Sequence, residues 1–359
     1  MSLAGSSMLT AGLRRRIYQQ WIDEGLSCFA KLHNNEAGSR SGCFFPPYRN
    51  RLSNYSNARW QEIVLPIAWS FVRHHDDSQL RMISEGISFW TTLQNRSGSF
   101  PQYCRRDNDF AATAFSSYAV AAALNCIGVN GLSKSSLQNA NVQDCLARTG
   151  NWLSKNNENV YSNQQMAAAL ALLEISLCLE DSKFERSAGR KLTQVLRQQK
   201  EGVFLEKKGF DIGYSTLTLE LLSRFLLRAT DKDQKDDIVA AVELYFESLT
   251  LRSTARYFGS GVRSTDWAIT GGFELFAPSI RKAKKLLEEI FLKQDVRHLH
   301  DTRHIHTDLC RLCFAYDQAV VDFPGSLDGN RKVKYPIVES EYKVTLRMLR
   351  PFGLHKFRW

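Results

Sequence analysis

Polar and aromatic side chains that can take part in chemistry gather in five segments of the chain. The segments are PQYCRRDNDF at 101–110, NNENVYSNQQ at 156–165, GFDIGYST at 209–216, ARYFGSGVRSTDWAITGG at 255–272 and RHLHDTRHIHTDLC at 297–310. Amide and guanidinium groups can stabilise a developing negative charge, and a tyrosine hydroxyl can move a proton when a nearby cation lowers its pKa. We expect these five segments to form one cleft.

Two types of predicted helix alternate along the chain and would position these segments. Amphipathic helices with a charged face are predicted at about 11–32, 78–94, 143–155, 183–199, 235–251 and 281–293. Helices rich in small and apolar residues are predicted at about 58–74, 111–127, 161–179, 213–228, 265–279 and 305–320. The second type is apolar on most sides, which is typical of buried helices. The two types alternate six times, with a period of about 50 residues.

The connections between these helices also recur. A glycine followed by an aromatic residue appears in SGCFFPPY at 41–48, SGSFPQY at 97–103 and EGVFLEKKGF at 201–210. Glycine allows a tight turn, and the aromatic side chain fills the core. Six helix pairs, charged outside and apolar inside, predict an all-α (α/α)6 toroid. An open solenoid is the alternative, but it requires polar caps at both ends. The long outer-to-inner connections would meet at one mouth of the ring.

Composition limits the class of protein. The chain has 359 residues, 43% of them hydrophobic and 23% charged, which excludes a disordered chain, a coiled coil and a collagen-like fibre. Eight cysteines are too few for a disulfide scaffold. The length suggests two domains, but the repeat favours one toroid domain at 1–330. The tail KVKYPIVESEYKVTLRML alternates as strands do, so 331–359 is predicted to be a short β-rich extension packed on the toroid.

Location and partners follow from the same composition. The start of the chain does not have the pattern of a secretory signal, and Cys126 and Cys178 lie in apolar helical patterns, so we expect a cytoplasmic protein with reduced cysteines. Apolar runs such as 166–173 are too short to span a bilayer, so no transmembrane segment is predicted. The net charge of +10 suggests an anionic partner or a solvated basic face. Without a basic tail or a nucleic-acid-binding motif, nucleic acid is disfavoured. No nucleotide-binding motif occurs and no cofactor is predicted.

A family resemblance rests on the third and fourth inner helices. Ser162, Asn163 and Gln164 open the third, and Tyr214 opens the fourth 51 residues after Asn163. With the six helix pairs, these residues resemble the catalytic toroid of the heparinase II/III-like polysaccharide lyases over about 300 residues. In that family an Asn-His pair typically opens the equivalent helix. A loop of the type aspartate-glycine-aromatic-x-glutamate precedes the tyrosine. The sequence EGVFLEKKGFDIGY is similar to that loop, with Glu206 in keeping.

The resemblance implies a reaction and roles for individual residues. Asn163 would hydrogen-bond the carboxylate of a uronic acid, and Tyr214 would act as general acid or base in β-elimination. Loss of the proton α to that carboxylate develops an enolate, which arginine stabilises, and Arg263 is our candidate for that role. The implied partner is an acidic polysaccharide or oligosaccharide, in carbohydrate metabolism or polysaccharide biosynthesis. The expected substrate-binding residues are Tyr103, Arg105, Arg106, Gln164, Asp211, Arg256, Tyr257, Trp267, His304 and His306. Gln164 stands where the family has histidine, and His304 and His306 are the candidates to replace it.

Structural roles remain open for the three catalytic candidates. Asn163 is also a good helix N-cap, and Tyr214 also fits as a core aromatic residue of the fourth inner helix. Arg263 can form a local ion pair with Asp266, three residues later. A non-catalytic carbohydrate-binding or scaffold protein would show aromatic and arginine side chains at the mouth without an acid–base pair.

Two further alternatives concern hydrolysis and metal binding. A glycoside hydrolase needs two carboxylates, and the candidates are Asp107, Asp109, Glu158, Asp211 and Asp266. A terpene cyclase is disfavoured because its aspartate-rich DxDD signature is missing. A zinc site can be imagined from His298, His300, His304, His306, Cys310 and Cys313. The segment 308–316 looks helical, however, so the two cysteines share a helix face and no metal is predicted.

Overall fold

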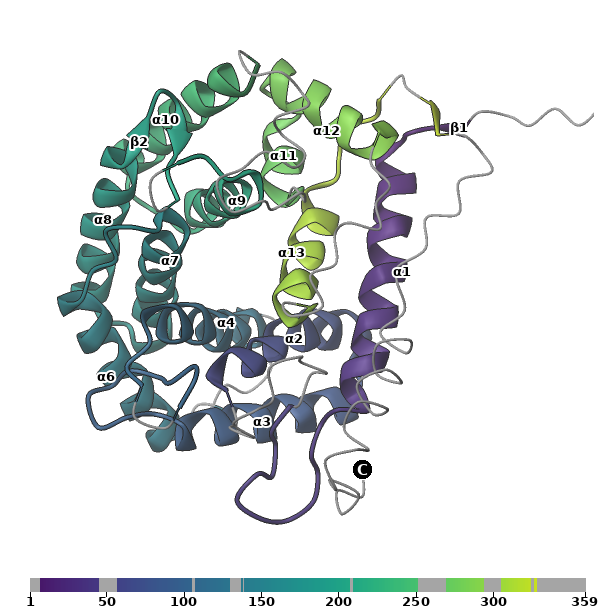
Figure 1. Cartoon of the computed structure of the whole chain (residues 1–359). Coiled ribbons are helices and arrows are strands. Elements are labelled where there is room, and N and C mark those ends of the chain that lie inside the picture. Colours follow the sequence, from purple (N-terminus) through teal and green to yellow (C-terminus); the bar gives the residue numbers. More distant parts are fainter. Residues whose placement is uncertain are drawn as a thin grey trace, which may run out of the picture.

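The chain folds into two concentric rings of helices (Figure 1). The computed structural model describes residues 7–44, 57–104, 107–129, 137, 139–206, 209–250, 269–293, 305–323 and 326–327. The inner ring contains the 3-10 helix η2 (Ala58–Ile63), which runs into α2 (Val64–His74), and then α4 (Phe110–Val129), α7 (Ser162–Leu179), α9 (Ile212–Arg228), α11 (Gly271–Phe276) and α13 (Ile305–Gln318). The outer ring contains α1 (Ala11–Ala30), α3 (Asp77–Thr92), α6 (Ala140–Lys155), α8 (Ser182–Arg197), α10 (Lys232–Thr250) and α12 (Arg281–Lys293). The predicted all-α (α/α)6 toroid is confirmed.

The inner ring is closed. Each inner helix packs against the next in the order α2, α4, α7, α9, α11 and α13, and α13 returns to η2 and α2 (Figure 1). An open solenoid would leave its first and last inner helices apart. The sequence explains the close packing of α4 and α7, because alanines such as Ala123 and Ala169 let two buried helices approach closely.

Outer helices bury one stripe each. On α8, Phe184, Ala188, Leu192 and Val195 recur at spacings of four and three residues and are all buried. Burying each of the three larger side chains stabilises the fold by about 1.5–3 kcal/mol. The opposite face of α8 carries charges and faces solvent, as predicted for the outer ring.

The recurrent glycines lie at the same structural position in three helix pairs. Gly42, Gly98 and Gly202 have φ of +82°, +95° and +79°, which side chains with a Cβ rarely adopt. A Cβ on any of them would collide with a backbone carbonyl oxygen of the following outer helix, on Glu85 of α3, Arg148 of α6 and Leu244 of α10 respectively. These linkers therefore press against the next helix pair, and only glycine fits there.

The aromatic residue two positions later fills the core, as the sequence predicted. Phe44, Phe100 and Phe204 are all fully buried. Phe100 stacks on Trp90 with ring centroids 4.3 Å apart, and Phe204 stacks on Tyr245 at 5.7 Å. Phe204 belongs to a small hairpin of β2 (Gln199–Lys200) and β3 (Val203–Phe204).

The first and last described elements fasten the ring. Strand β1 (Ser7–Met8) pairs antiparallel with β4 (Ser326–Leu327), and α1 packs on α13. Arg14 of α1 is fully buried and forms a bidentate ion pair with Glu274 of α11, at 2.7 and 2.8 Å. The predicted β-rich extension at 331–359 lies outside the described residues, so it and the 1–330 boundary stay predictions.

The segment Phe110–Gly128 of α4 is long and apolar enough to cross a membrane. Ser116 and Ser117 interrupt its apolar residues, so the uninterrupted apolar runs of the sequence do not reveal this helix. In the structure 83% of the segment is buried inside the ring. A buried core helix passes the same test of length and composition, so this segment is weak evidence for a membrane span.

Candidate functional site

The predicted catalytic residues Asn163 and Tyr214 lie at the starts of two neighbouring inner helices. Asn163 is the second residue of α7 and Tyr214 is the third residue of α9. Because an outer helix separates each inner helix from the next, the inner helices begin at the same mouth of the toroid. The mouth thus holds both residues.

The side chain of Glu206 joins Asn163 to the linker before α9. Its Oε1 accepts a hydrogen bond from the backbone N–H of Asn163 at 3.0 Å, and its Oε2 accepts one from Asn163 Nδ2 at 2.6 Å. The N-cap residue of α7 is Tyr161, whose side chain makes no capping bond. Asn163 is therefore not the N-cap that the alternative interpretation suggested. A carboxylate from another part of the chain takes the capping role.

Glu206 is a carboxyl group that titrates near neutrality. Burial raises its pKa to about 7, against the opposing effect of the two Asn163 donors, while the nearby Asp211 carboxylate raises it further. Thr218 Oγ1 of α9 donates to Glu206 Oε1 at 3.4 Å. A carboxyl group with such a pKa is suited to general acid or base chemistry.

Asp211 and Tyr214 shape the start of α9. Asp211 is fully buried and caps the helix, since its Oδ1 accepts the backbone N–H of Tyr214 at 3.1 Å. Tyr214 is half-buried and packs against the edge of the hydrophobic core. Along α9, Tyr214, Leu217, Leu221 and Arg224 follow each other at spacings of three, four and three residues. They share one stripe of the helix.

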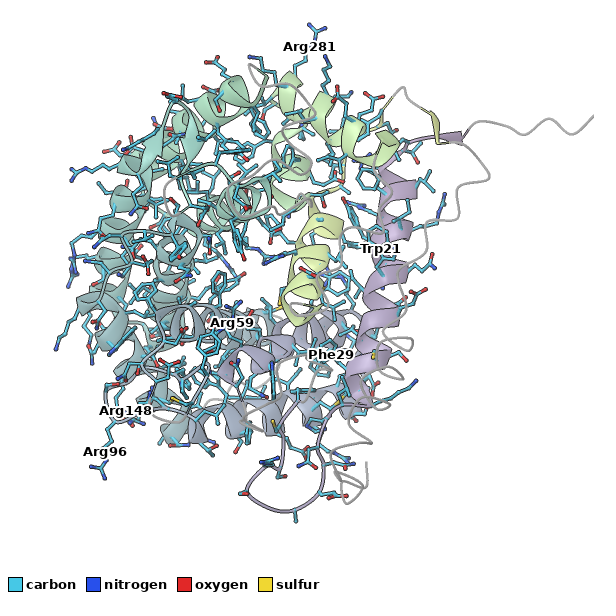
Figure 2. The ribbon with its side chains drawn as sticks, in the orientation of Figure 1. Trp21, Phe29, Arg59, Arg96, Arg148 and Arg281 are labelled. Carbon is cyan, nitrogen blue, oxygen red and sulfur yellow. The ribbon has the colours of Figure 1, made fainter. Side chains whose placement is uncertain are left out.

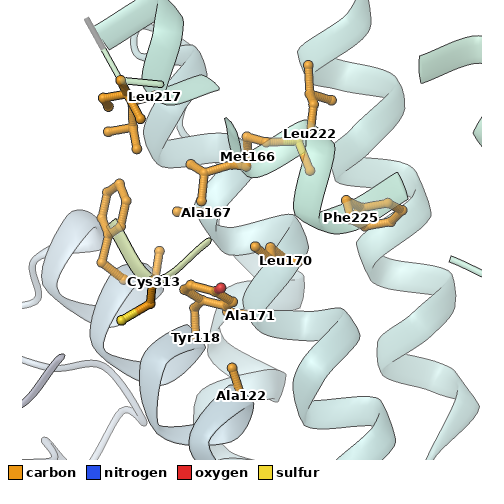
Figure 3. Packing of buried hydrophobic residues seen from close by; sticks show 14 of the residues in the cluster. Tyr118, Ala122, Met166, Ala167, Leu170, Ala171, Leu217, Leu222, Phe225 and Cys313 are labelled. Atoms are coloured by element: carbon orange, nitrogen blue, oxygen red, sulfur yellow. The ribbon is translucent and has the colours of Figure 1, made fainter. Parts of the chain in front are cut away.

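That stripe leads from the mouth to a pocket inside the ring. The pocket is small, with about 20 Å³ of space open to a water-sized molecule. Six residues around it have polar side chains and come from four inner elements: Glu62, Tyr118, Glu220, Arg224, Cys310 and Arg311. The apolar wall includes Leu217 and Leu221 of the α9 stripe. Figure 3 shows part of the buried cluster around the pocket, in which Tyr118 of α4 lies with Leu170 and Ala171 of α7.

Ion pairs line this pocket. Nε and Nη2 of Arg224 donate to Glu220 Oε1 at 3.0 and 2.8 Å, and Nη1 donates to the Tyr118 hydroxyl at 2.7 Å. Burial raises the pKa of Tyr118 far above its ordinary value, even though Arg224 lowers it. Tyr118 therefore keeps its proton at neutral pH and serves as a hydrogen-bonding group.

Two further arginines lie close to the pocket. Arg59 pairs with Glu62, and Arg311 Nη1 lies 2.7 Å from Asp308 Oδ1. Arg59 lies on the inner side of the ring, whereas Arg96, Arg148 and Arg281 project outward (Figure 2). The arginines around the pocket are thus paired with carboxylates.

Of the other predicted site residues, the structure describes Tyr103 and Gln164. Tyr103 is 66% exposed on the linker before α4, and Gln164 is half-buried in the first turn of α7. Arg105, Arg106, Arg256, Tyr257, Arg263, Trp267 and His304, together with the side chain of His306, lie outside the described residues.

The carboxylates proposed for hydrolysis mostly hold backbone turns. Asp107 Oδ2 accepts from the Tyr103 N–H at 3.2 Å, Asp109 Oδ1 from the Ala112 N–H at 2.6 Å, and Glu158 Oε1 from the Val160 N–H at 2.7 Å. Burial raises the pKa of Asp109. Asp266 lies outside the described residues.

The two cysteines of the zinc alternative are buried one turn apart on α13. Cys310 Sγ donates to the backbone oxygen of Glu62 at 3.5 Å. Burial raises the pKa of both Cys310 and Cys313, which favours the thiol over the thiolate that binds metals. Within the described residues, no group of three or more His, Cys, Asp or Glu side chains has the arrangement of a metal site. His298, His300 and His304 lie outside them.

Sequence reasoning missed the charged residues inside the ring as well as the role of Glu206. A signal for them was present. Glu220 and Arg224 are four residues apart in LELLSRFLLR, a stretch in which most other residues are apolar. An opposite-charge pair at this spacing in a buried helix indicates side chains that face a polar interior.

Comparisons with known proteins identify the fold. No protein-family model and no curated protein sequence matches the chain. A solved structure of a polysaccharide lyase is similar over 84% of this chain and 97% of its own, with 10% identity and a TM-score of 0.52. A crystal structure of a D-mannose isomerase is similar over 93% of this chain and 98% of its own, with 14% identity and a TM-score of 0.54. At these identities the likeness shows a shared fold.

Proposed function

We propose that this protein is a carbohydrate-active enzyme that binds an acidic saccharide at the mouth of the ring and cleaves it by β-elimination. One observation carries the proposal. Glu220, Arg224 and Tyr118 form a charged and hydroxylated cluster in the middle of apolar helices. Buried charges reduce stability unless they are well paired, and they concentrate at functional sites. The two similar structures are a polysaccharide lyase and a sugar isomerase, which supports a sugar ligand.

The proposed reaction breaks the glycosidic bond without water. A base removes the proton α to the uronate carboxylate, and the electron pair forms a carbon–carbon double bond. The bond to the glycosidic oxygen breaks, and that oxygen takes up a proton. Tyr214 is our acid–base residue, because it lies at the mouth on the α9 stripe that continues to Arg224. The resemblance to heparinase-like lyases supports the same assignment.

Amide and guanidinium groups would hold the uronate. An asparagine amide has two N–H hydrogens, and Glu206 takes one from Asn163. That bond fixes the amide so that its second hydrogen serves a substrate carboxylate. Arg224 and Arg311 line the pocket below the mouth, and each is paired with a carboxylate. Arg263 remains our proposed cation at the mouth itself. A cytoplasmic location and a place in polysaccharide metabolism are part of the same proposal.

A second candidate function is hydrolysis with Glu206 as general acid. The observation that favours it is the pKa of Glu206, which burial raises to about 7, next to a second buried carboxylate on Asp211. A glycoside hydrolase typically uses two carboxyl groups in different environments. Both are engaged at helix starts, however, which is why we place elimination first.

The Tyr214→Phe variant tests the leading proposal. Purified protein is incubated with a panel of acidic polysaccharides, and absorbance is followed at the ultraviolet band of unsaturated uronates. We expect wild-type protein to produce a rise that Tyr214→Phe abolishes, because the hydroxyl carries the proton. Tyr316→Phe is the matched control, since Tyr316 is also half-buried on an inner helix but packs edge-on against Trp69 at 5.3 Å. A rise that survives in Tyr214→Phe would refute its role.

A further inference from the structure

A buried lysine lies beneath the linker that leads into α7. Lys191 belongs to the outer helix α8 and is only 2% exposed. Its Nζ donates to the backbone oxygen of Asn156 at 2.6 Å and to Oδ1 of Asn157 at 2.8 Å. This linker joins the outer helix α6 to the inner helix α7 at the mouth (Figure 1). Lys191 therefore places a positive charge directly under the rim of the mouth.

The charge of Lys191 is not balanced by a carboxylate. Both of its acceptors are uncharged oxygen atoms, and none of the Asp or Glu side chains that the structure describes forms an ion pair with it. Burial and the neighbouring Arg190 lower the pKa of Lys191 to about 8, so most of the protein still carries this charge at pH 7. A buried charge without a counter-ion reduces stability, and such charges concentrate at functional sites. A bound anion would supply the missing counter-ion.

Asn157 connects this buried charge to the surface. The residue is exposed, unlike the lysine beneath it. Because a lysine ammonium has only donors, the amide oxygen of Asn157 has to face Lys191, and its NH2 group points the other way. Within the described part of the chain, this NH2 group makes no hydrogen bond. A cation at the amide oxygen polarises the amide, which makes the outward N–H groups stronger donors.

Gln165 fixes the direction of the Asn157 amide. This residue of α7 is fully buried, and its Nε2 donates to Asn157 Oδ1 at 3.3 Å and to Gln194 Oε1 of α8. Its own Oε1 accepts the backbone N–H of Glu158 at 2.8 Å. The amide oxygen of Asn157 thus has donors from two helices, and the outward NH2 group is held in one orientation. A donor that is already ordered binds a ligand at a lower cost in entropy.

A second amide lies on the other side of the start of α7. Asn163 is tied to the linker before α9 through Glu206, whereas Asn157 is tied to α8. Six residues of chain separate the two amides, which keeps their Cα atoms within about 22 Å of each other. A saccharide of several rings covers such a distance. One chain that is bound at the mouth can therefore contact both amides.

We propose that Asn157 and Lys191 form an outer subsite, which binds a carboxylate of the saccharide chain where it leaves the mouth. The NH2 group of Asn157 donates to the carboxylate, and Lys191 supplies the positive charge behind it. The inference rests on the proposed function and makes it more specific. The preferred substrate carries a second acidic sugar beyond the one that reacts.

The Asn157→Asp variant separates this role from a purely structural one. Aspartate has nearly the same size and gives Lys191 a carboxylate partner, but it has no N–H and repels an anion. We therefore expect a higher melting temperature than in the wild type, together with a loss of at least about tenfold in affinity for the acidic saccharide. A lysine that only holds the linker predicts the higher melting temperature without the loss of affinity, and that result would overturn the inference. A lower melting temperature would also overturn it, because the charge of Lys191 would then already be balanced.

Asn159→Asp is the matched control. It makes the same change of charge two residues away, on an exposed side chain that has no hydrogen bond with the residues that the structure describes. We expect its affinity to stay within about threefold of the wild type, as for other exposed charges. Equal losses in Asn157→Asp and Asn159→Asp would show general repulsion by negative charge and would contradict the outer subsite.

The affinities are measured by isothermal titration calorimetry with tetrasaccharides that contain galacturonate, mannuronate or glucuronate, each as the free acid and as its methyl ester. We expect the Asn157→Asp variant to lose affinity for the acid that binds and to change affinity for the corresponding ester by less than about twofold, because the ester has no charge to recognise. An equal loss for acid and ester would overturn carboxylate recognition.

The same experiments distinguish this inference from the proposed reaction. Binding that depends on Asn157, without release of an unsaturated product by the wild type, would refute elimination and keep the outer subsite. Elimination by the wild type, together with wild-type affinity in Asn157→Asp, would keep the reaction and refute the outer subsite. Binding of none of the tetrasaccharides would overturn both.

Discussion

Asn163 and Glu206 are 43 residues apart in the chain, yet one carboxylate of Glu206 takes both the backbone N–H and the side-chain amide of Asn163, at 3.0 and 2.6 Å. This contact ties the start of α7 to the linker that leads into α9. It also places a carboxyl group with a pKa of about 7 beside the residue that we expect to meet the substrate. Asn163 and Glu206 therefore hold the mouth of the toroid together, and the same contact makes the stability of the mouth depend on pH.

The first prediction concerns stability against pH. Burial raises the pKa of Glu206 from 4.5 to about 7, so the folded state favours its protonated form. The resulting stabilisation is full below the unfolded pKa of 4.5 and is lost as the pH rises through 7. The free energy of unfolding of the wild type, relative to Glu206→Gln, should thus fall by about 3 kcal/mol over this range. Chemical denaturation at several pH values measures it.

The control for this prediction is Glu24→Gln, which changes an exposed carboxylate on α1. Its difference from the wild type should stay nearly constant over the same pH range. If the Glu206→Gln difference is equally flat, the pKa of Glu206 is not raised in the folded protein.

The second prediction separates elimination from hydrolysis. A general acid contributes about 10²–10⁴-fold to a rate, so a hydrolase that depends on Glu206 would lose that factor in Glu206→Gln. If Tyr214 carries the proton in an elimination, Glu206→Gln should lose only about tenfold, because glutamine still accepts one of the two Asn163 hydrogen bonds and the hold on the Asn163 amide is weakened. Initial rates of reducing-end formation provide the comparison. A loss of a thousandfold with a folded variant would favour the hydrolase.

The sequence predicted the fold better than the site. Helix periodicity is a local property, so the boundaries of α8 and α9 came within a few residues of the predicted ranges. The repeated Gly-x-aromatic linkers predicted a ring. In the structure, each of these glycines packs against a backbone carbonyl of the following outer helix. The partnership of Asn163 with Glu206 depends on how two distant linkers pack. Periodicity and composition do not contain that information, and Glu206 was noted only through the family resemblance.

The charged interior illustrates the same limit. The predicted site lay in linkers and at helix starts, whereas Glu220 and Arg224 lie in the middle of an inner helix. Tyr118 and Cys310, which share the Arg224 guanidinium, come from helices far away in sequence. A single helix pattern reveals that Arg224 is unusual, but only the closed ring shows that it spans the lumen.

A third prediction tests the repeated glycine. Gly202 has φ of +79°, and a Cβ there would lie 2.6 Å from the backbone oxygen of Leu244. Gly202→Ala should therefore lower the free energy of unfolding by about 1–3 kcal/mol, the usual cost of a strained backbone conformation. Gly12→Ala is the control, since Gly12 is exposed on helix α1 and a Cβ there approaches only the Thr10 hydroxyl, at 3.8 Å. It should be neutral or stabilising. Equal effects would contradict the packing role of Gly202.

A fourth prediction concerns the ion pair between Arg14 of α1 and Glu274 of α11. Arg14 and Glu274 are both fully buried, so Arg14→Ala leaves an uncompensated carboxylate in the core. We expect a loss of about 3–5 kcal/mol in the free energy of unfolding. Arg148→Ala removes an exposed pair with Asp144 on α6 and should cost at most about 1 kcal/mol. Urea denaturation of the two variants gives both values. A small loss of unfolding free energy in Arg14→Ala would mean that this ion pair does not hold the ring closed.

The central claim is that the toroid cleaves an acidic saccharide by elimination. Mass spectrometry of the products after incubation with acidic oligosaccharides of defined length tests it most directly. Elimination adds no water, so the masses of the two fragments must sum to that of the substrate, and one fragment must carry an unsaturated uronate. We predict this result for the wild type and its loss in Tyr214→Phe. Fragments whose masses sum to the substrate plus one water would show hydrolysis and contradict the account.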